Sequence, residues 1–187
     1  MRRILAPVAT SLILALLVGC TASRSVTSRA DLDGLFVRLR TTANADEARR
    51  IELAILHAWT SSGRADVDAL MLRGAEMAHT GDLDGALETY NRIVELAPNF
   101  AEAYDQRALI HAMRDEYGKA VTDIERVLVI EPRHFGALAG LGRILMLYGQ
   151  DKAALRAFEA ALAINPHLDD VRDEADRLRA TLAGQPI

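Results

Sequence analysis

Residues 101–134 read AEAYDQRALIHAMRDEYGKAVTDIERVLVIEPRH, which is two alanine-rich amphipathic segments closed by a proline near the end. The arrangement recurs on both sides, because Pro98, Pro132 and Pro166 are spaced 34 residues apart. Aligning the chain on these prolines gives three units, 67–100, 101–134 and 135–168. A fixed period of this length is typical of repeat architectures, in which stacked units bury a core that no single unit can bury alone.

Four positions of the repeat hold the same kind of side chain in every unit. Positions 8 and 20 are always Gly or Ala, and positions 24 and 27 are always apolar. In that order the residues are Gly74, Ala108 and Gly142; Ala86, Ala120 and Ala154; Tyr90, Ile124 and Phe158; and Ile93, Val127 and Ala161. Two antiparallel helices approach to about 8–10 Å only where the side chains at the crossing are small. Each unit is therefore predicted to be a helical hairpin.

Prolines and turn residues divide the repeats into helices. A proline inside a helix costs about 3 kcal/mol, so the proline of each unit ends its second helix. Gly81 and Gly149 mark the turn between the two helices, and Asp115 fills that slot in the middle unit. The predicted helices lie near 66–79, 82–96, 100–114, 117–130, 134–147 and 151–163. Residues 169–183 add an amphipathic segment that is predicted to cap the last repeat, since terminal units need a polar outer surface.

This spacing, with its alternation of small and large residues, resembles the tetratricopeptide repeat in all three copies, from residue 67 to 168. The resemblance implies an all-α fold, a right-handed solenoid of helical hairpins with a C-terminal capping helix. It also implies that the first helix of each hairpin lines a concave groove, in which a peptide or protein segment binds. The candidate groove residues are Asp68, Met71, Ala75, His79, Glu102, Asp105, Gln106, Leu109, Met113, Arg143 and Met146, with Ala139 beside them.

The candidate groove combines acidic side chains with methionines. Flexible thioethers suit an adaptable peptide site, although the methionines equally fit contacts with the cap or the upstream hairpin. Some family members hold a peptide's C-terminal carboxylate with Lys and Asn, and that cluster is missing here. Asp68, Glu102 and Asp105 instead favour a segment with basic and apolar side chains.

Upstream of the repeats, residues 31–63 also show helical spacing of apolar residues, from Leu32 to Trp59. The segment departs from the family pattern, because Ser61-Ser62-Gly63 makes the break where a proline is expected. We predict a divergent helical hairpin that stacks under the first repeat. The alternative is a hairpin that docks elsewhere on the chain or on a partner.

The N-terminus has the layout of a secretory signal peptide, with Arg2-Arg3, an apolar run and then Leu17-Val18-Gly19-Cys20. The apolar run is about 15 residues long and contains Pro7, whereas a membrane-spanning helix needs about 20. Leu-Val-Gly-Cys resembles the bacterial lipobox. That resemblance implies cleavage of residues 1–19 and attachment of acyl chains such as palmitate to Cys20. The alternative is an ordinary signal peptide or an uncleaved anchor, in which Cys20 is incidental.

The lipobox resemblance also implies a location. Several acyl chains on one cysteine make a lasting anchor, since each buried CH₂ contributes about 0.8 kcal/mol. Thr21, which is not Asp, is compatible with transfer to the outer membrane of Gram-negative bacteria. Residues 20–30 are rich in Ser and Thr and are predicted to be a flexible tether of roughly 17 Å. The expected location is therefore the periplasmic face of the outer membrane in the cell envelope.

Composition and motifs argue against several classes of protein. A net charge of −4 gives no electrostatic footprint for nucleic acid. The single cysteine leaves no internal disulfide and no thiolate site. No nucleophile motif or phosphate-binding glycine loop is present, and the glycines of residues 136–142 lie inside a predicted helix. We expect no enzyme activity, no metal, no cofactor and no small-molecule substrate.

The histidines have no partner at metal-binding or catalytic spacing in the sequence. His111 is expected to be buried or half-buried, whereas His134 and His167 are expected to face solvent in loops. Arg107 occupies a repeat position that is usually Leu in the family. Its expected partner is Asp123 on the following helix, a structural rather than a ligand-binding role, and Arg107→Leu is expected to fold normally.

The function predicted from the sequence is that of a membrane-anchored scaffold or adaptor in the bacterial cell envelope. It would bind a protein or peptide in its groove and attach to the membrane through its lipid. The alternative is a structural subunit of an envelope complex, held by permanent oligomeric packing.

Overall fold

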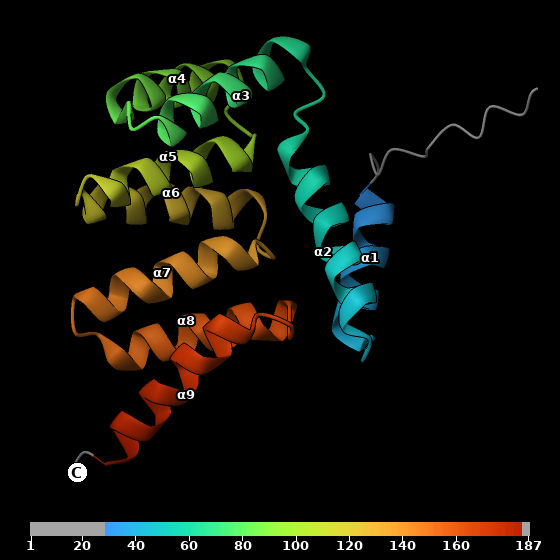
Figure 1. Ribbon diagram of the computed structural model, residues 1–187, viewed down its shortest axis with the longest axis vertical. Helices are drawn as coiled ribbons and strands as arrows, with labels where there is room; N and C mark the ends of the chain where they lie inside the picture. Colours follow the sequence, from blue (N-terminus) through green and yellow to red (C-terminus); the bar gives the residue numbers. More distant parts are fainter. Residues whose placement is uncertain (1–28, 185–187) are drawn as a thin grey trace, which may run out of the picture.

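The computed structural model describes residues 29–184, and within this range every element of regular structure is a helix (Figure 1). The signal peptide, Cys20 and most of the predicted tether lie outside the described residues. The end of that tether, residues 29 and 30, belongs instead to the first helix. No helix among the described residues has the length and apolar character needed to cross a bilayer.

Seven helices match the sequence expectation to within a few residues. The three repeats comprise α3 (Ala65–His79) and α4 (Leu83–Leu96), α5 (Ala101–Met113) and α6 (Tyr117–Ile130), and α7 (Phe135–Leu147) and α8 (Asp151–Ile164). The cap is α9 (Asp169–Ala183), and its buried residues are Val171, Ala175 and Leu178. The two helices of each unit lie antiparallel, and the units stack into an all-α solenoid (Figure 1).

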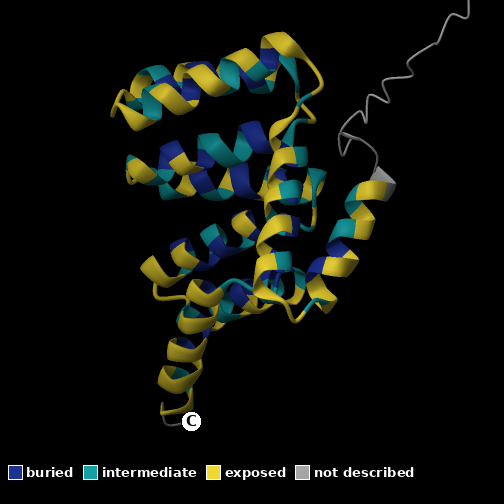
Figure 2. Ribbon diagram, turned by 45° about the vertical axis from the view of Figure 1, so that its right-hand side comes forward, coloured by how far each residue is buried: buried dark blue, intermediate teal, exposed yellow. Residues whose placement is uncertain are grey.

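The small and large positions that recur in the three repeats form the cores of the hairpins. Ala86, Ala120 and Ala154 have no exposed surface, and the same holds for Ile93, Val127 and Ala161. Sizes match within each unit: Gly74 faces Tyr90 and Gly142 faces Phe158, whereas the middle unit pairs the smaller Ile124 with Ala108. A Cβ on Gly74 would lie 2.8 Å from the Tyr90 ring, so glycine is required where the partner is aromatic. Buried residues accordingly gather on the inward faces of the helices (Figure 2).

The turns inside the hairpins confirm the positions assigned from sequence. Gly81 and Gly149 have φ values of 84° and 68°, in the left-handed region that glycine adopts without steric cost. Asp115, in the same slot, has φ 59° and is the one non-glycine with positive φ among residues 29–184.

The upstream segment folds into the predicted hairpin, α1 (Arg29–Thr41) and α2 (Ala45–Thr60), but its predicted position is wrong. It does not stack under the first repeat. Figure 1 shows α1 and α2 alongside the solenoid, with α2 running across the units rather than continuing them. The apolar cluster around Val67 and Tyr90 of the first repeat contains no residue of the hairpin.

The hairpin instead packs against the third repeat. Phe36, Leu39, Ile55 and Trp59 share one apolar cluster with residues of α7, α8 and α9, including Phe135, Ala139 and Phe158. The reason lies in α7, whose sequence FGALAGLGRILML offers small side chains on the concave face. The large side chains of the hairpin fill this space. Ala139, a candidate groove residue, is therefore buried under the hairpin and only 3% exposed.

Contacts from Arg133 and His167 hold α1 against the solenoid. Arg133 lies 4.3 Å over the Phe36 ring and donates to Asp33 at 2.5 Å. His167 places Nε2 3.1 Å from the backbone oxygen of Leu39. The prediction that His167 faces solvent is therefore wrong, since the side chain is half-buried beneath α1.

Candidate functional site

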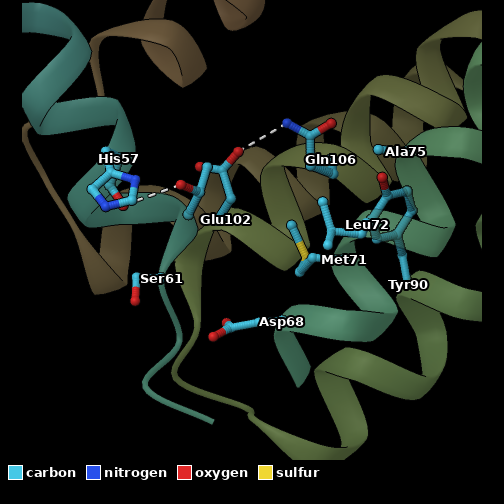
Figure 3. A pocket seen from close by; sticks show the side chains of 10 residues that line it. His57, Ser61, Asp68, Met71, Leu72, Ala75, Tyr90, Glu102 and Gln106 are labelled. Carbon is cyan, nitrogen blue, oxygen red and sulfur yellow. Dashed lines mark hydrogen bonds between the residues drawn. The ribbon is translucent and has the colours of Figure 1, made fainter. Parts of the chain in front are cut away.

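The first helices of the repeats, α3, α5 and α7, line the concave face, and α2 crosses part of it. This crossing creates a cavity of about 410 Å³ between the C-terminal end of α2 and the helices α3 and α5. Its lining consists of His57, Thr60, Ser61, Asp68, Met71, Leu72, Ala75, Tyr90, Glu102 and Gln106. In Figure 3, His57 and Ser61 lie on one side of Glu102, and Met71, Leu72 and Tyr90 lie on the other. We call this the hairpin cavity.

Two carboxylates lie in the hairpin cavity. Asp68 accepts from the backbone N–H of Ser62 at 2.9 Å and from its hydroxyl at 2.6 Å, and these bonds hold the link between α2 and α3. Glu102 is 7% exposed, and its Oε1 accepts from the Gln106 amide at 2.9 Å. Apolar walls dominate the rest of the lining, and Leu72 is 75% exposed at the edge.

A second cavity, of about 310 Å³, lies between α5, α6 and α7. Gly136 and Gly140 line it, and their missing side chains leave space. A Cβ on Gly140 would have the Ile124 Cδ1, 3.8 Å away, as its nearest side-chain atom. We call this the repeat cavity. Its lining includes three candidate groove residues, Asp105, Leu109 and Arg143.

The structure therefore divides the candidate groove residues into three groups. Asp68, Met71, Ala75, Glu102 and Gln106 line the hairpin cavity, and Asp105, Leu109 and Arg143 line the repeat cavity. His79, Met113 and Met146 line neither. Arg143 donates to Asp170 at 2.7 Å and to Glu174 at 3.1 Å, so its charge is paired with the capping helix. Met113 is 53% exposed, which means that neither cap nor hairpin covers it.

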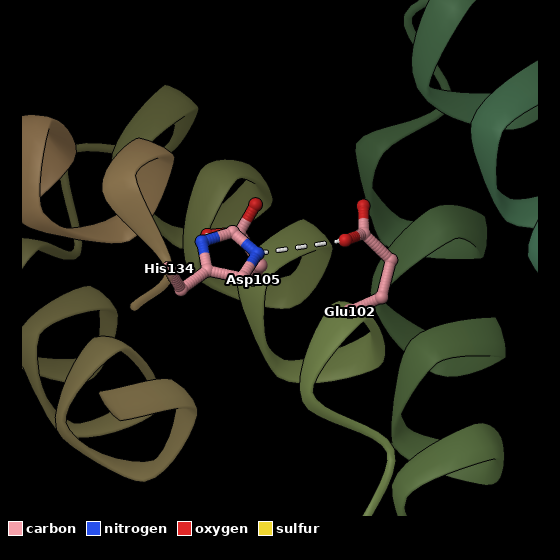
Figure 4. Close-up of side chains that lie close together, drawn as sticks. All are labelled: Glu102, Asp105 and His134. Carbon is pink, nitrogen blue, oxygen red and sulfur yellow. Dashed lines mark ion pairs between the residues drawn. The ribbon is translucent and has the colours of Figure 1, made fainter. Parts of the chain in front are cut away.

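His134 contradicts the expectation of a solvent-facing loop residue, because it is 3% exposed. Its ring stacks on Trp59, with centroids 4.3 Å apart and an interplanar angle of 15°. Nδ1 accepts from the Ala137 N–H at 3.0 Å and so caps the N-terminus of α7. Nε2 points toward Glu102 Oε2 at 3.6 Å, and Asp105 lies beside the ring (Figure 4). This histidine connects the hairpin to the acidic part of the concave face.

Glu102, Asp105 and His134 also form a group whose possible ligand atoms all lie within 4.8 Å of one another. The sequence spacing gave no sign of it, because His134 is the last residue of the unit that Glu102 and Asp105 begin, far from both along the chain. The donor set fits a metal poorly, since Nδ1 accepts a backbone hydrogen bond and the neutral ring then carries its hydrogen on Nε2. A metal on Nε2 would require the loss of the Ala137 bond.

Asp105 and His134 have raised pKa values. Burial raises the pKa of Asp105 to about 6, with His134 opposing the shift and Glu102 adding to it. For His134, burial lowers the pKa, but Glu102, Asp105 and Glu131 together outweigh burial and raise it above 6.5. Protonation at Nδ1 would exchange the Ala137 bond for an ion pair with Asp105.

These directions predict a pH dependence of stability. A group with a raised folded-state pKa stabilises the fold below its unfolded pKa, and this contribution is lost as pH rises through the folded value. We expect the free energy of unfolding of the wild type, relative to Asp105→Asn, to fall by up to about 3 kcal/mol between pH 3.8 and 6. Relative to His134→Gln it should fall above pH 6.5. Urea denaturation across this range measures both differences, and pH-independent differences would refute the assignment.

The middle repeat contains a buried polar network, as the sequence indicated. Arg107 donates to both carboxylate oxygens of Asp123, at 2.8 and 2.6 Å, and also to Asn91. His111 is 7% exposed, as expected, and places Nδ1 2.7 Å from Glu116. The partner predicted for Arg107 is confirmed, and its role is structural because Asp123 is 4% exposed.

Sequence reasoning missed the part of the site that comes from α2. His57, Thr60 and Ser61 were assigned to a hairpin under the first repeat, whereas they form one wall of a cavity on the concave face. Trp59, the single tryptophan, was the available signal. A large aromatic residue at the end of a segment with no partner of its own requires a pocket elsewhere.

Comparisons with known proteins agree with the geometry. No protein-family model matches the chain. A TPR repeat-containing protein of Rhizobium etli is 35% identical over 153 residues, which are 82% of this chain and 75% of that protein. The first TPR of Spaghetti (RPAP3), bound to the HSP90 peptide SRMEEVD, superposes with a TM-score of 0.60 at 17% identity, covering 63% of this chain and 94% of that domain.

A further neighbour is the second TPR domain of human RPAP3 in complex with the HSP70 peptide SGPTIEEVD, with a TM-score of 0.55 and 21% identity. It covers 59% of this chain and 92% of that one. Likeness at this level of identity supports the fold alone. The Rhizobium etli relative carries the family assignment, because its similarity extends over most of both chains. The chain belongs to the tetratricopeptide repeat family.

Proposed function

We propose that this protein is a lipid-anchored scaffold of the bacterial cell envelope, whose concave face binds a segment of another protein. The observation that carries the binding part is the pair of cavities on the concave face, which are bordered by exposed apolar side chains such as Leu72 and Leu109. Exposed apolar side chains that border a cavity are typical of interaction sites. Two structural neighbours with this fold hold peptides, which supports the proposal.

The anchor rests on the sequence of residues 17–20. Cys20 as a lipidated N-terminus would hold the solenoid at a membrane surface, on the periplasmic face of the outer membrane. No chemical step is part of the proposal, and the protein acts by holding a partner near the membrane. Membrane fractionation tests the anchor: the wild type should sediment with membranes and Cys20→Ala should be soluble. A Cys20→Ala protein that stays in the membrane fraction would contradict the lipid anchor.

Site-specific photo-crosslinking in cells tests the binding face. A photoreactive amino acid in place of Leu72, at the edge of the hairpin cavity, should trap a specific protein partner. The matched control is Val129 on α6, which is 71% exposed against 75% for Leu72 but lines neither cavity. Equal trapping from both positions, or trapping from Val129 alone, would place the interaction elsewhere.

The alternative function, permanent packing into an oligomer, is favoured by one observation. Leu147 and Tyr148 are 64% and 54% exposed at the end of α7, where a second chain could cover them. Size-exclusion chromatography with light scattering separates the two functions. The scaffold is expected to be monomeric without its partner, whereas an obligate assembly would show no monomer.

A further inference from the structure

The hairpin cavity is lined by two carboxylates and by no lysine or arginine. The carboxylates are those of Asp68 and Glu102, and the other lining residues with polar groups are His57, Thr60, Ser61, Tyr90 and Gln106. Among residues 29–184, no lysine or arginine side chain forms an ion pair with either carboxylate. Asp68 is bound by Ser62, and Glu102 has the neutral amide of Gln106 and, at 3.6 Å, the His134 ring.

Glu102 is the more consequential of the two. It is 7% exposed, and its one basic neighbour among residues 29–184 is the His134 ring, so much of its desolvation cost is uncompensated whenever that ring is neutral. The His134 tautomer that caps α7 offers Glu102 only a neutral N–H at long range, and that atom makes no hydrogen bond. The side of Glu102 that faces the cavity is therefore a position where an added positive charge would be strongly favoured.

The walls of the cavity suit the rest of a basic side chain. Met71, Leu72, Ala75 and Tyr90 form an apolar lining on the α3 and α4 side. The methylene stem of a lysine or arginine packs well on such a surface while its charged end contacts a carboxylate. A volume of about 410 Å³ has room for one long side chain with adjoining backbone.

We propose that the hairpin cavity is the anchor site for a basic side chain of the bound segment. Its stem would lie against Met71 and Leu72, and its cationic end would contact Glu102, with Asp68 contributing from the rim. The proposal rests on the proposed function, because it names the chemistry of the segment that the concave face binds. Peptides that end in acidic residues, like the EEVD endings held by the two neighbours, are disfavoured here by like charge.

The test uses two peptides that differ only in the ammonium group, acetyl-Leu-Lys-Leu-amide and acetyl-Leu-norleucine-Leu-amide. Binding is followed by the NMR signal of the Met71 methyl group, with Met113 and Met146 outside the cavity as internal references. The lysine peptide is expected to bind about tenfold more tightly than the norleucine peptide. In Glu102→Gln this preference should disappear, and in Glu125→Gln, a matched change of an exposed glutamate on α6, it should be kept.

The outcomes separate this inference from the proposed function. Equal binding of both peptides, or a lysine preference that survives in Glu102→Gln, overturns the basic anchor. If photo-crosslinking from Leu72 still captures a partner in that case, the scaffold function stands without it. Loss of the preference in Glu125→Gln as well would mean that overall charge, and not the cavity, selects the peptide. Unfolding curves of both variants show whether Glu102→Gln leaves the fold intact.

Discussion

Trp59→Ala is expected to lower the free energy of unfolding by about 3–5 kcal/mol, the usual range for removing a large buried aromatic side chain. The Trp59 side chain is 8% exposed and contacts Phe36, His134 and Phe135, with ring centroids 4.3–5.9 Å apart. It is the point at which the end of α2 joins the third repeat. The loss should also be concentrated in the hairpin, because Trp59 belongs to the apolar cluster that joins the hairpin to the third repeat.

Chemical denaturation measures the overall change, and hydrogen exchange shows where it falls. In Trp59→Ala the amides of α1 and α2 should exchange much faster, while those of α3 and α4 keep their protection. Leu53→Ala on the same helix is the control. Leu53 is 59% exposed, so its loss should change stability by no more than about 0.5 kcal/mol. A Trp59→Ala protein as stable as Leu53→Ala would mean that the hairpin does not pack on the third repeat.

Arg107→Leu is expected to destabilise the protein by about 3–5 kcal/mol, the range measured when one partner of a buried ion pair is removed. The sequence alone predicts that this variant folds normally. The structure changes that expectation, because Asp123 is 4% exposed and Arg107 satisfies both of its oxygens. Without Arg107 the remaining basic side chain near Asp123 is His111, whose Nε2 lies 3.9 Å from Asp123 Oδ2.

The double variant Arg107→Leu/Asp123→Leu should recover most of this loss, because two apolar side chains then replace the pair. Arg73→Leu is the matched control, since Arg73 occupies the same repeat position in the first unit but is exposed. It should change stability by no more than about 0.5 kcal/mol. The denaturation midpoints of the wild type, the two single variants and the double variant measure these differences in stability. Equal stability of Arg107→Leu and Arg73→Leu would show that the buried pair contributes nothing.

The repeats were predictable because their signal is local and repeated. A helical hairpin needs small residues at its crossing, and each of the three units shows them within 34 residues. The pairing of Gly142 with Phe158 also lies within one unit, between repeat positions 8 and 24. The Arg107–Asp123 pair was also predictable, because both residues lie in one hairpin.

The hairpin's position and the surroundings of His134 were not predictable, because they depend on contacts between residues that are far apart in the sequence. Trp59 meets His134 across 75 residues of sequence, and Asp33 meets Arg133 across 100. Periodicity gives the buried face of a helix but not the surface that covers it. The chain order favoured the adjacent first repeat, whereas the small side chains of α7 provided the better fit. The hairpin cavity, whose wall comes from α2, was hidden together with that contact.

Thiol crosslinking tests most directly whether the hairpin crosses the concave face to the third repeat. In a Cys20→Ser background, Asp33→Cys is combined either with Arg133→Cys, its observed neighbour, or with Arg73→Cys on the first repeat. A short bifunctional thiol-reactive reagent, such as a bis-maleimide, should join positions 33 and 133 efficiently within one chain and leave positions 33 and 73 unlinked. Efficient linkage of 33 to 73 without linkage of 33 to 133 would return the hairpin to the first repeat and remove the wall of the cavity.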